Sequence, residues 1–182
     1  MAGTVTRFTG GSAGPWKVDS IRPVKGDCLP LVERIAIHHS PDDLIQGGVW
    51  SLSGVISHVR YVERSEKIEL TSKQAPLGRA EADRAALIPI RKSSSWWELT
   101  QEERRRIFET ESRHIGDSLK YLPAIARQLY HSRDLGEEFD FLTWFEYSSA
   151  HAQFFEELVQ HLRQTNEWKY VDRELDIRLS RE

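Results

Sequence analysis

One arginine lies within an apolar stretch that is predicted to be a β-strand. Residues 124–132 read Ala-Ile-Ala-Arg-Gln-Leu-Tyr-His-Ser, and period-two alternation puts Arg127 on the same strand face as Ile125 and Leu129. A guanidinium keeps its charge at any relevant pH and presents a fork of donors that matches an oxyanion. Two interpretations stay open. Arg127 either reaches the sheet edge and pairs with a carboxylate, or it receives an anion in a pocket from which the aliphatic side chains exclude water.

The next predicted strand, over 139–147, carries a row of aromatic side chains interrupted by one hydroxyl. Alternation places five residues on one face of this strand: Phe139, Phe141, Thr143, Phe145 and Tyr147. Such a row is either ordinary core or the wall of a site for a flat cofactor. The spacing alone does not choose between the two.

Metal-binding residue types are sparse in this chain. The single cysteine, Cys28, excludes an internal disulfide and a sulfur-rich metal site, so a metal would be held by histidine or carboxylate or would arrive inside a cofactor. The seven histidines form no HExxH motif. His114 stands apart because it lies, with Ile107, on the apolar side of a predicted helix. It is either a hydrogen-bonded core imidazole or a ligand.

The charge balance limits the classes of partner. Acidic residues outnumber basic ones by 28 to 25, for a net charge of -3, which argues against a nucleic-acid-binding protein. No apolar run approaches the roughly 20 residues that cross a bilayer. Residues 1–14 are polar and do not resemble a signal peptide. We therefore expect a cytoplasmic protein with no nucleic-acid or membrane partner.

The length of 182 residues predicts a single domain. Its two parts differ in the secondary structure that their sequences predict. Residues 1–92 are mainly strands, predicted at 4–9, 16–24, 32–39, 54–62 and 85–92. Thr100 and Glu103 then form a capping box that opens a helix over 101–119. The strands at 124–132 and 139–147 follow. A helix capped by Ser148 or Ser149 runs to about residue 164, and a last strand covers 169–179.

The order β-α-β-β-α-β from residue 85 onward predicts a ferredoxin-like unit of the α+β class. Pro89 favours an edge position for its strand. The strands before residue 85 are expected to extend the sheet. Its face opposite the helices would then be covered by a partner subunit or a ligand.

Three segments together resemble the chlorite dismutase family, haem enzymes that convert chlorite to chloride and dioxygen. They are Lys92-Ser-Ser-Ser-Trp96-Trp97-Glu-Leu, Ser112-Arg113-His114-Ile115-Gly116 and Tyr121-Leu-Pro-Ala-Ile-Ala-Arg127. The resemblance covers about residues 54–179, and the short N-terminal half is similar to the compact, dimeric branch. It implies a dimeric α+β barrel, a homodimer, one haem b per subunit, and chlorite and other small anions as ligands. Residues 93–179 would form the haem-binding part.

The resemblance also implies a role for each matching residue. His114 would be the proximal ligand of the haem iron, and Glu167 would accept its other ring proton. Arg127 would be the distal, catalytic arginine. Other haem-binding roles are implied as follows: Lys92 and Tyr61 bind propionates, Trp96 and Trp97 pack beside the haem, Gln74 approaches Arg127 at the pocket mouth, and Thr143 and Phe145 line the distal side.

The implied reaction breaks the O–Cl bond of chlorite and lets hypochlorite rebound to form dioxygen, with Arg127 holding the anion. Coproheme decarboxylase is the nearest alternative; that group lacks the distal arginine and has a tyrosine about four residues before the lysine. Here residues 85–92 contain no tyrosine and Arg127 is present, which favours chlorite chemistry. A non-enzymatic haem-binding barrel is the alternative from another class.

Overall fold

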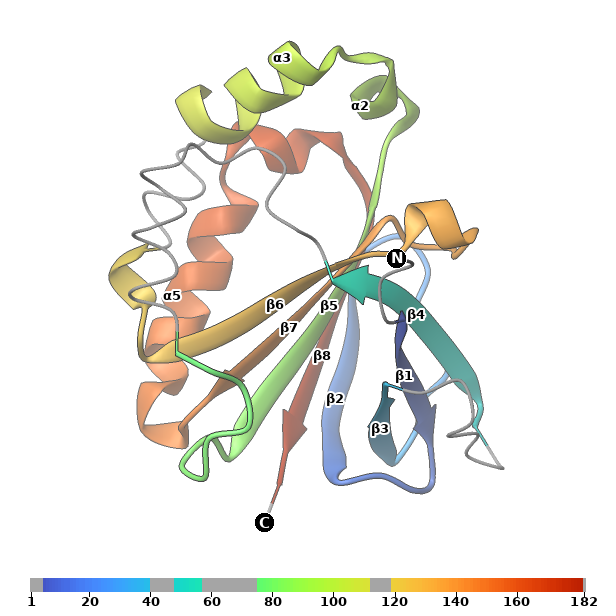
Figure 1. The fold of residues 1–182 in the computed structure, drawn as a ribbon, viewed down its shortest axis with the longest axis vertical. Coiled ribbons are helices and arrows are strands. Elements are labelled where there is room, and N and C mark those ends of the chain that lie inside the picture. Colours follow the sequence, from blue (N-terminus) through green and yellow to red (C-terminus); the bar gives the residue numbers. More distant parts are fainter. Residues whose placement is uncertain (1–4, 40–47, 57–74, 112–118, 182) are drawn as a thin grey trace.

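In the part of the chain that the structure describes, eight antiparallel strands form a closed barrel (Figure 1). The computed structural model describes residues 5–39, 48–56, 75–111 and 119–181. The neighbour order is β1-β3-β2-β8-β5-β7-β6-β4, and pairing of β1 with β4 closes the ring. The strands are β1 (Val5–Gly11), β2 (Trp16–Lys25), β3 (Arg34–His38), β4 (Trp50–Ile56), β5 (Arg84–Lys92), β6 (Ile125–His131), β7 (Phe141–Tyr147) and β8 (Val171–Ser180).

The second half of the chain is the predicted ferredoxin-like unit. Its sheet order is β8-β5-β7-β6, and the first half repeats this pattern as β2-β3-β1-β4. The two halves join through seven residue pairs between β2 and β8 and, in the part of the chain that the structure describes, two pairs between β4 and β6. The expectation that a partner subunit or a ligand covers the sheet face opposite the helices was therefore wrong, because the sheet closes on itself. The α+β barrel that the family resemblance implied is confirmed.

The helices of the described residues all follow β5, and α5 (Ala152–Arg163) lies along the strands of the second half in Figure 1. Thr100 Oγ1 accepts a hydrogen bond from Glu103 N, and Glu103 Oε2 accepts one from Thr100 N, so the capping box is confirmed. The helix it opens changes to π-helical geometry at Arg106. The helical segments are α2 (Ser94–Glu98), α3 (Gln101–Arg105), η1 (Arg106–Glu111), η2 (Leu119–Tyr121), η3 (Arg133–Leu135), η4 (Ser149–His151), α5 (Ala152–Arg163) and η5 (Asn166–Tyr170).

Two separate hydrophobic cores lie on the two faces of the sheet. The barrel interior holds one core, which includes Phe8, Trp16, Trp50, Trp144 and Leu175. The other core lies between the sheet and the helices. It includes Ile88, Ile125, Phe145, Phe155 and Leu158. The aromatic and aliphatic residues of each strand alternate between these cores, as a strand covered on both faces requires.

Pro89 does not lie on an edge strand, contrary to the prediction. Strand β5 is internal, between β7 and β8. Among the described pairs, β5 meets β8 at Leu87 and again at Ile90, with none at Ile88 and Pro89. A proline has no N–H to donate, and this gap in the ladder accommodates it.

Phe139 also departs from the prediction. Strand β7 begins only at Phe141, so the alternation does not extend back to residue 139. Phe139 is instead 1% exposed within the barrel core, and the guanidinium carbon of Arg173 lies 4.5 Å from its ring centroid. The aromatic row on the helix side therefore begins at Phe141.

Candidate functional site

Strands β6 and β7 bring three of the predicted site residues onto one face. In their register, Arg127 pairs with Phe145 and Leu129 pairs with Thr143. Directly paired residues of an antiparallel sheet project to the same side. Phe145 belongs to the helix-side core, so Arg127 and Thr143 face the helices too. The predicted strand faces are confirmed here.

Burial changes along this face. At one end α5 covers it, where the Phe155 ring centroid lies 5.1 Å from that of Phe145 and 4.4 Å from that of Tyr147. Further along, Arg127 and Thr143 are half-buried and Leu129 is 37% exposed. Arg127 thus lies where a closed apolar core gives way to an accessible apolar wall.

Lys92 lies at the end of β5, beside a β-bulge. Pairing with β8 shifts between Arg91, which meets Arg173, and Lys92, which meets Val171. The Lys92 ammonium lies 2.7 Å from Glu167 Oε1, and the two side chains are 3% and 7% exposed. It also lies 4.5 Å from the Trp96 ring centroid. A buried ion pair of this kind is stable only while both partners are in place.

The remaining predicted roles stand as follows. The family resemblance implied that Lys92 binds a propionate and that Glu167 accepts from the proximal histidine, whereas the structure pairs these two residues with each other. Their roles toward a haem stay predictions. His114, Tyr61 and Gln74 lie outside the described residues.

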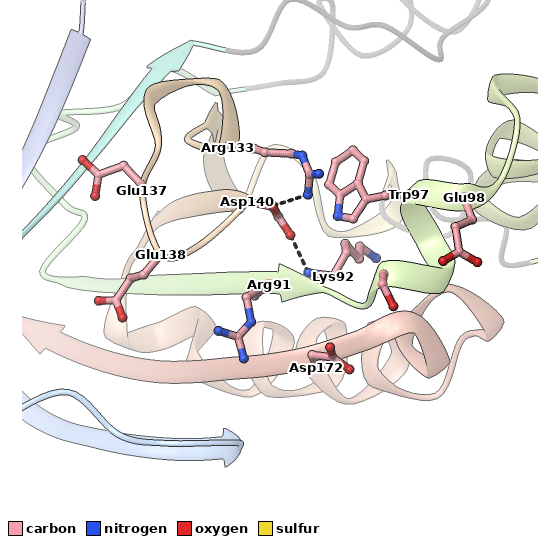
Figure 2. Close-up of a pocket in the computed structure, with 10 residues that line it drawn as sticks. Arg91, Lys92, Trp97, Glu98, Arg133, Glu137, Glu138, Asp140 and Asp172 are labelled. Atoms are coloured by element: carbon pink, nitrogen blue, oxygen red, sulfur yellow. Dashed lines mark hydrogen bonds and ion pairs between the residues drawn. The ribbon is translucent and has the colours of Figure 1, made fainter.

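Trp97 is held between other side chains, as Figure 2 shows for Arg133. Its ring stacks on Phe141 at a centroid distance of 6.1 Å and an interplanar angle of 16°. The guanidinium carbons of Arg133 and Arg104 lie 3.9 Å and 5.1 Å from its centroid. Trp97 Nε1 is buried and has no hydrogen-bond acceptor among the described residues.

A cleft of about 620 Å³ opens beside Trp97 and Lys92 (Figure 2). Five carboxylates and three cationic side chains are among the residues that line it: Glu98, Glu137, Glu138, Asp140 and Asp172, with Arg91, Lys92 and Arg133. The carboxylates outnumber the cationic side chains, so the charges of these lining residues sum to a negative value.

The residues present fit a haem. The accessible wall on β6 and β7 offers apolar and aromatic surface to a flat ring, with the Arg127 cation on the same face. Trp97 Nε1 is an enclosed donor that a propionate oxygen would satisfy. A large apolar surface with a few fixed polar groups is the usual composition of a cofactor site.

A charged network between α5 and β8 was missed by the sequence reasoning. Arg163 Nη2 lies 2.7 Å from Glu174 Oε1 and 2.9 Å from Asp176 Oδ2, and Arg178 Nε also pairs with Asp176. Burial alone would raise the pKa of Asp176, but the hydrogen bonds and charges of Arg178 and Arg163 outweigh it and hold that pKa below its ordinary value. Charges at every second position of β8 were the signal that could have revealed it.

This network touches the Lys92 site through Trp168. Trp168 Nε1 donates to Glu174 Oε2 at 2.7 Å, and the Lys92 ammonium lies 5.5 Å from the Trp168 ring centroid. The network therefore fixes one wall around the buried lysine.

No helix in the described ranges combines the length and the apolar character that crossing a bilayer requires.

Comparison with known proteins agrees with this geometry. The family model described as chlorite dismutase matches residues 44–182. The chlorite dismutase of Ideonella dechloratans is 34% identical over 122 residues, which are 66% of this chain and 41% of that relative, so the chain spans less than half of its length.

Solved structures are similar over nearly the whole chain. The dimeric chlorite dismutase from Nitrobacter winogradskyi has a TM-score of 0.92 and 62% identity, over 97% of this chain and 99% of that one. The chlorite dismutase from Candidatus Nitrospira defluvii, solved in complex with imidazole, has a TM-score of 0.68 and 23% identity, over 99% and 92%, which supports the fold alone. The chain belongs to the chlorite dismutase family.

Proposed function

We propose that this protein is a haem b enzyme that converts chlorite to chloride and dioxygen. The observation that carries the proposal is the position of Arg127, half-buried on an apolar wall opposite Phe145 and beside an accessible Leu129. Membership in the chlorite dismutase family supports the same reaction.

Each residue would contribute through position and charge. When bound, haem supplies the redox-active iron at which the O–Cl bond breaks and the O–O bond forms. His114 would hold that iron, and Trp97 and Lys92, with Tyr61, would hold the propionates. The Arg127 guanidinium would bind chlorite and then keep the hypochlorite leaving group in the pocket. Leu129, Thr143 and Phe145 would exclude water, which strengthens the attraction between Arg127 and an anion.

The proposal includes a homodimer with one haem per subunit, acting in the cytoplasm. The relative from Nitrobacter winogradskyi, which is 62% identical, is described as dimeric. Analytical ultracentrifugation of the haem-loaded protein tests the subunit number directly.

Oxygen evolution tests the reaction. Chlorite is added to the haem-loaded protein on an oxygen electrode, and prompt release of dioxygen is expected, with one chloride formed for each dioxygen. No oxygen release, together with peroxide-dependent conversion of coproheme to haem b, would move the assignment to coproheme decarboxylase. Haem binding with neither reaction would indicate a non-enzymatic haem-binding barrel.

A further inference from the structure

Asp140 connects three segments at the rim of the proposed haem site. It is 5% exposed and lies just before β7. Its backbone N donates to Ile90 O at 2.9 Å, and its backbone O accepts from Ser132 N at 3.0 Å. These bonds join the start of β7 to the end of β5 and to the turn after β6.

The Asp140 side chain extends this connection to Lys92. The last residue pair between β5 and β7 is Ile90 with Phe141, so no β7 backbone carbonyl follows for the Lys92 N–H in the described ladder. Asp140 Oδ2 takes that place and accepts from Lys92 N at 2.7 Å (Figure 2). A carboxylate acceptor makes a stronger hydrogen bond than a neutral carbonyl. The carboxylate therefore holds the backbone of Lys92 at the bulge, where the ammonium turns toward Glu167.

The other oxygen of the same carboxylate acts on Trp97. Asp140 Oδ1 accepts from Arg133 Nη1 at 3.2 Å, and the Arg133 guanidinium carbon lies 3.9 Å from the Trp97 ring centroid. Arg133 is 49% exposed in its side chain and would otherwise sample many rotamers. One buried carboxylate thus fixes the surroundings of both Lys92 and Trp97.

We infer that Asp140 is a positioning residue for the haem site, which holds Lys92 and, through Arg133, Trp97 in the arrangement that receives the propionate side of haem. This inference rests on the proposed function. Asp140 acts through other residues and is not assigned a contact with haem. Neither the family motifs nor the charge pattern of the sequence distinguishes it from the neighbouring carboxylates.

The chain offers a matched control for this residue. Asp172 lines the same cleft, is exposed, and its carboxylate makes no hydrogen bond or ion pair with any described residue. Asp172→Asn therefore removes one negative charge from the cleft without breaking a side-chain contact. Asp140→Asn removes the same charge and leaves one of its two donors without an acceptor, because an amide has a single oxygen.

Haem affinity and reduction potential are measured for the wild type and both variants. Loss of a residue that orients a binding group typically costs about tenfold or more in affinity, so we expect Asp140→Asn to raise the haem Kd by that factor and Asp172→Asn to leave it within about twofold. The reduction potential of the haem distinguishes a simple loss of charge from a displacement of Lys92, because the two shift it in opposite directions. Loss of a negative charge alone raises it, whereas displacement of the Lys92 ammonium from Glu167 lowers it. We expect a lower potential in Asp140→Asn.

A measurement on the apoprotein keeps this inference separate from the proposed function. The Lys92 amide proton is expected to exchange faster with solvent, and to move upfield in the NMR spectrum, in Asp140→Asn but not in Asp172→Asn. An unchanged Lys92 amide or an unchanged haem Kd in Asp140→Asn overturns the positioning role. If the wild type binds no haem, the proposed function fails together with the haem part of the inference, whatever the amide shows.

A second variant covers the case in which Asp140→Asn does not fold. Arg133→Gln changes an exposed side chain and leaves the bond from Lys92 N to Asp140 in place. An exposed cation–π contact corresponds to about a two- to fivefold effect, and we expect a rise of that size in the haem Kd with an unchanged Lys92 amide. If the haem Kd does not rise in Arg133→Gln, Trp97 is no longer part of the inference.

Discussion

At the residue scale, Arg127 is singled out both by the strand pattern of the sequence and by the proposed reaction, in which it binds the anion. A half-buried guanidinium on an apolar wall attracts a small anion more strongly than one in water, because little solvent screens its charge. We predict that Arg127→Ala keeps its haem but releases hypochlorite during turnover, so that the haem bleaches within far fewer turnovers. A hypochlorite trap such as monochlorodimedone detects the leak. Arg91→Ala, which removes an exposed arginine, serves as control, and an equal leak in both variants contradicts the role.

The Lys92–Glu167 pair gives a prediction about stability. Removing one partner of a buried ion pair leaves the other charge unpaired, so Lys92→Met is expected to lower the free energy of unfolding by about 3 kcal/mol. The double variant Lys92→Met/Glu167→Gln should recover most of that loss, because no uncompensated charge remains. Urea unfolding of the apoproteins measures both. A double variant no more stable than Lys92→Met rejects the explanation.

Site residues were predictable where strand periodicity applied and less so elsewhere. Alternation put Arg127, Thr143 and Phe145 on one face, because both strands are regular there. It gave no information about Asp140, whose importance comes from a hydrogen bond to Lys92, 48 residues away in sequence. Long-range bonds made by an irregular segment leave no local pattern.

At the element scale, the packing of α5 on β8 depends on charge as well as on apolar contact. Asp176 has a pKa below its ordinary value in the folded chain, because the hydrogen bonds and charges of Arg178 and Arg163 outweigh burial. Its ionised form therefore stabilises the fold at pH values above the unfolded pKa of about 3.9, and this contribution is lost as the pH falls through the lower, folded pKa.

Asp176→Asn should test this pH dependence. We expect it to lower the free energy of unfolding by about 2 to 4 kcal/mol at neutral pH. The difference from wild type should stay constant down to about pH 5 and shrink below about pH 4. Urea unfolding from about pH 2.5 to about pH 7 provides the measurement. Asp172→Asn, on the same strand but exposed, should show no such loss. A pH-independent difference for Asp176→Asn contradicts this origin.

The sequence predicted well which segments form helices and strands, and less well where each of them lies in the fold. The strands, the capping box and the ferredoxin-like order follow from local periodicity and capping residues, which act over a few positions. The internal position of β5 could not be read from Pro89, since the gap in its ladder with β8 is a property of both strands together. The π-helical turn at Arg106 also had no distinct signal.

At the scale of the whole molecule, closure of the barrel depends on Gly54 in β4. A Cβ at this position would lie 2.6 Å from Tyr130 Cβ and 3.0 Å from Ser132 Oγ, so any larger residue forces β4 away from β6. We predict that Gly54→Ala lowers the free energy of unfolding by about 1 to 3 kcal/mol, as other overpacked sites do.

Hydrogen exchange can locate that effect. Amides of β4 and β6 at this seam should lose protection first, while those of the longer β2–β8 seam keep theirs. Ser51→Ala, at an exposed position of the same strand, is the control. Uniform loss of protection around the barrel would show that the two seams open together. Barrel closure did not follow from the strand pattern, because it depends on how far the sheet curves; the family resemblance alone implied it.

The separation of the two hydrophobic cores bears on the order in which the protein folds and binds its proposed haem. The barrel interior is filled by its own side chains, and Arg127, Thr143 and Phe145 of the proposed haem site lie on the other face of the sheet. The barrel can therefore form before any haem is inserted. If the proposed function holds, a cell short of haem would accumulate a folded, protease-resistant precursor that gains its activity once haem is supplied.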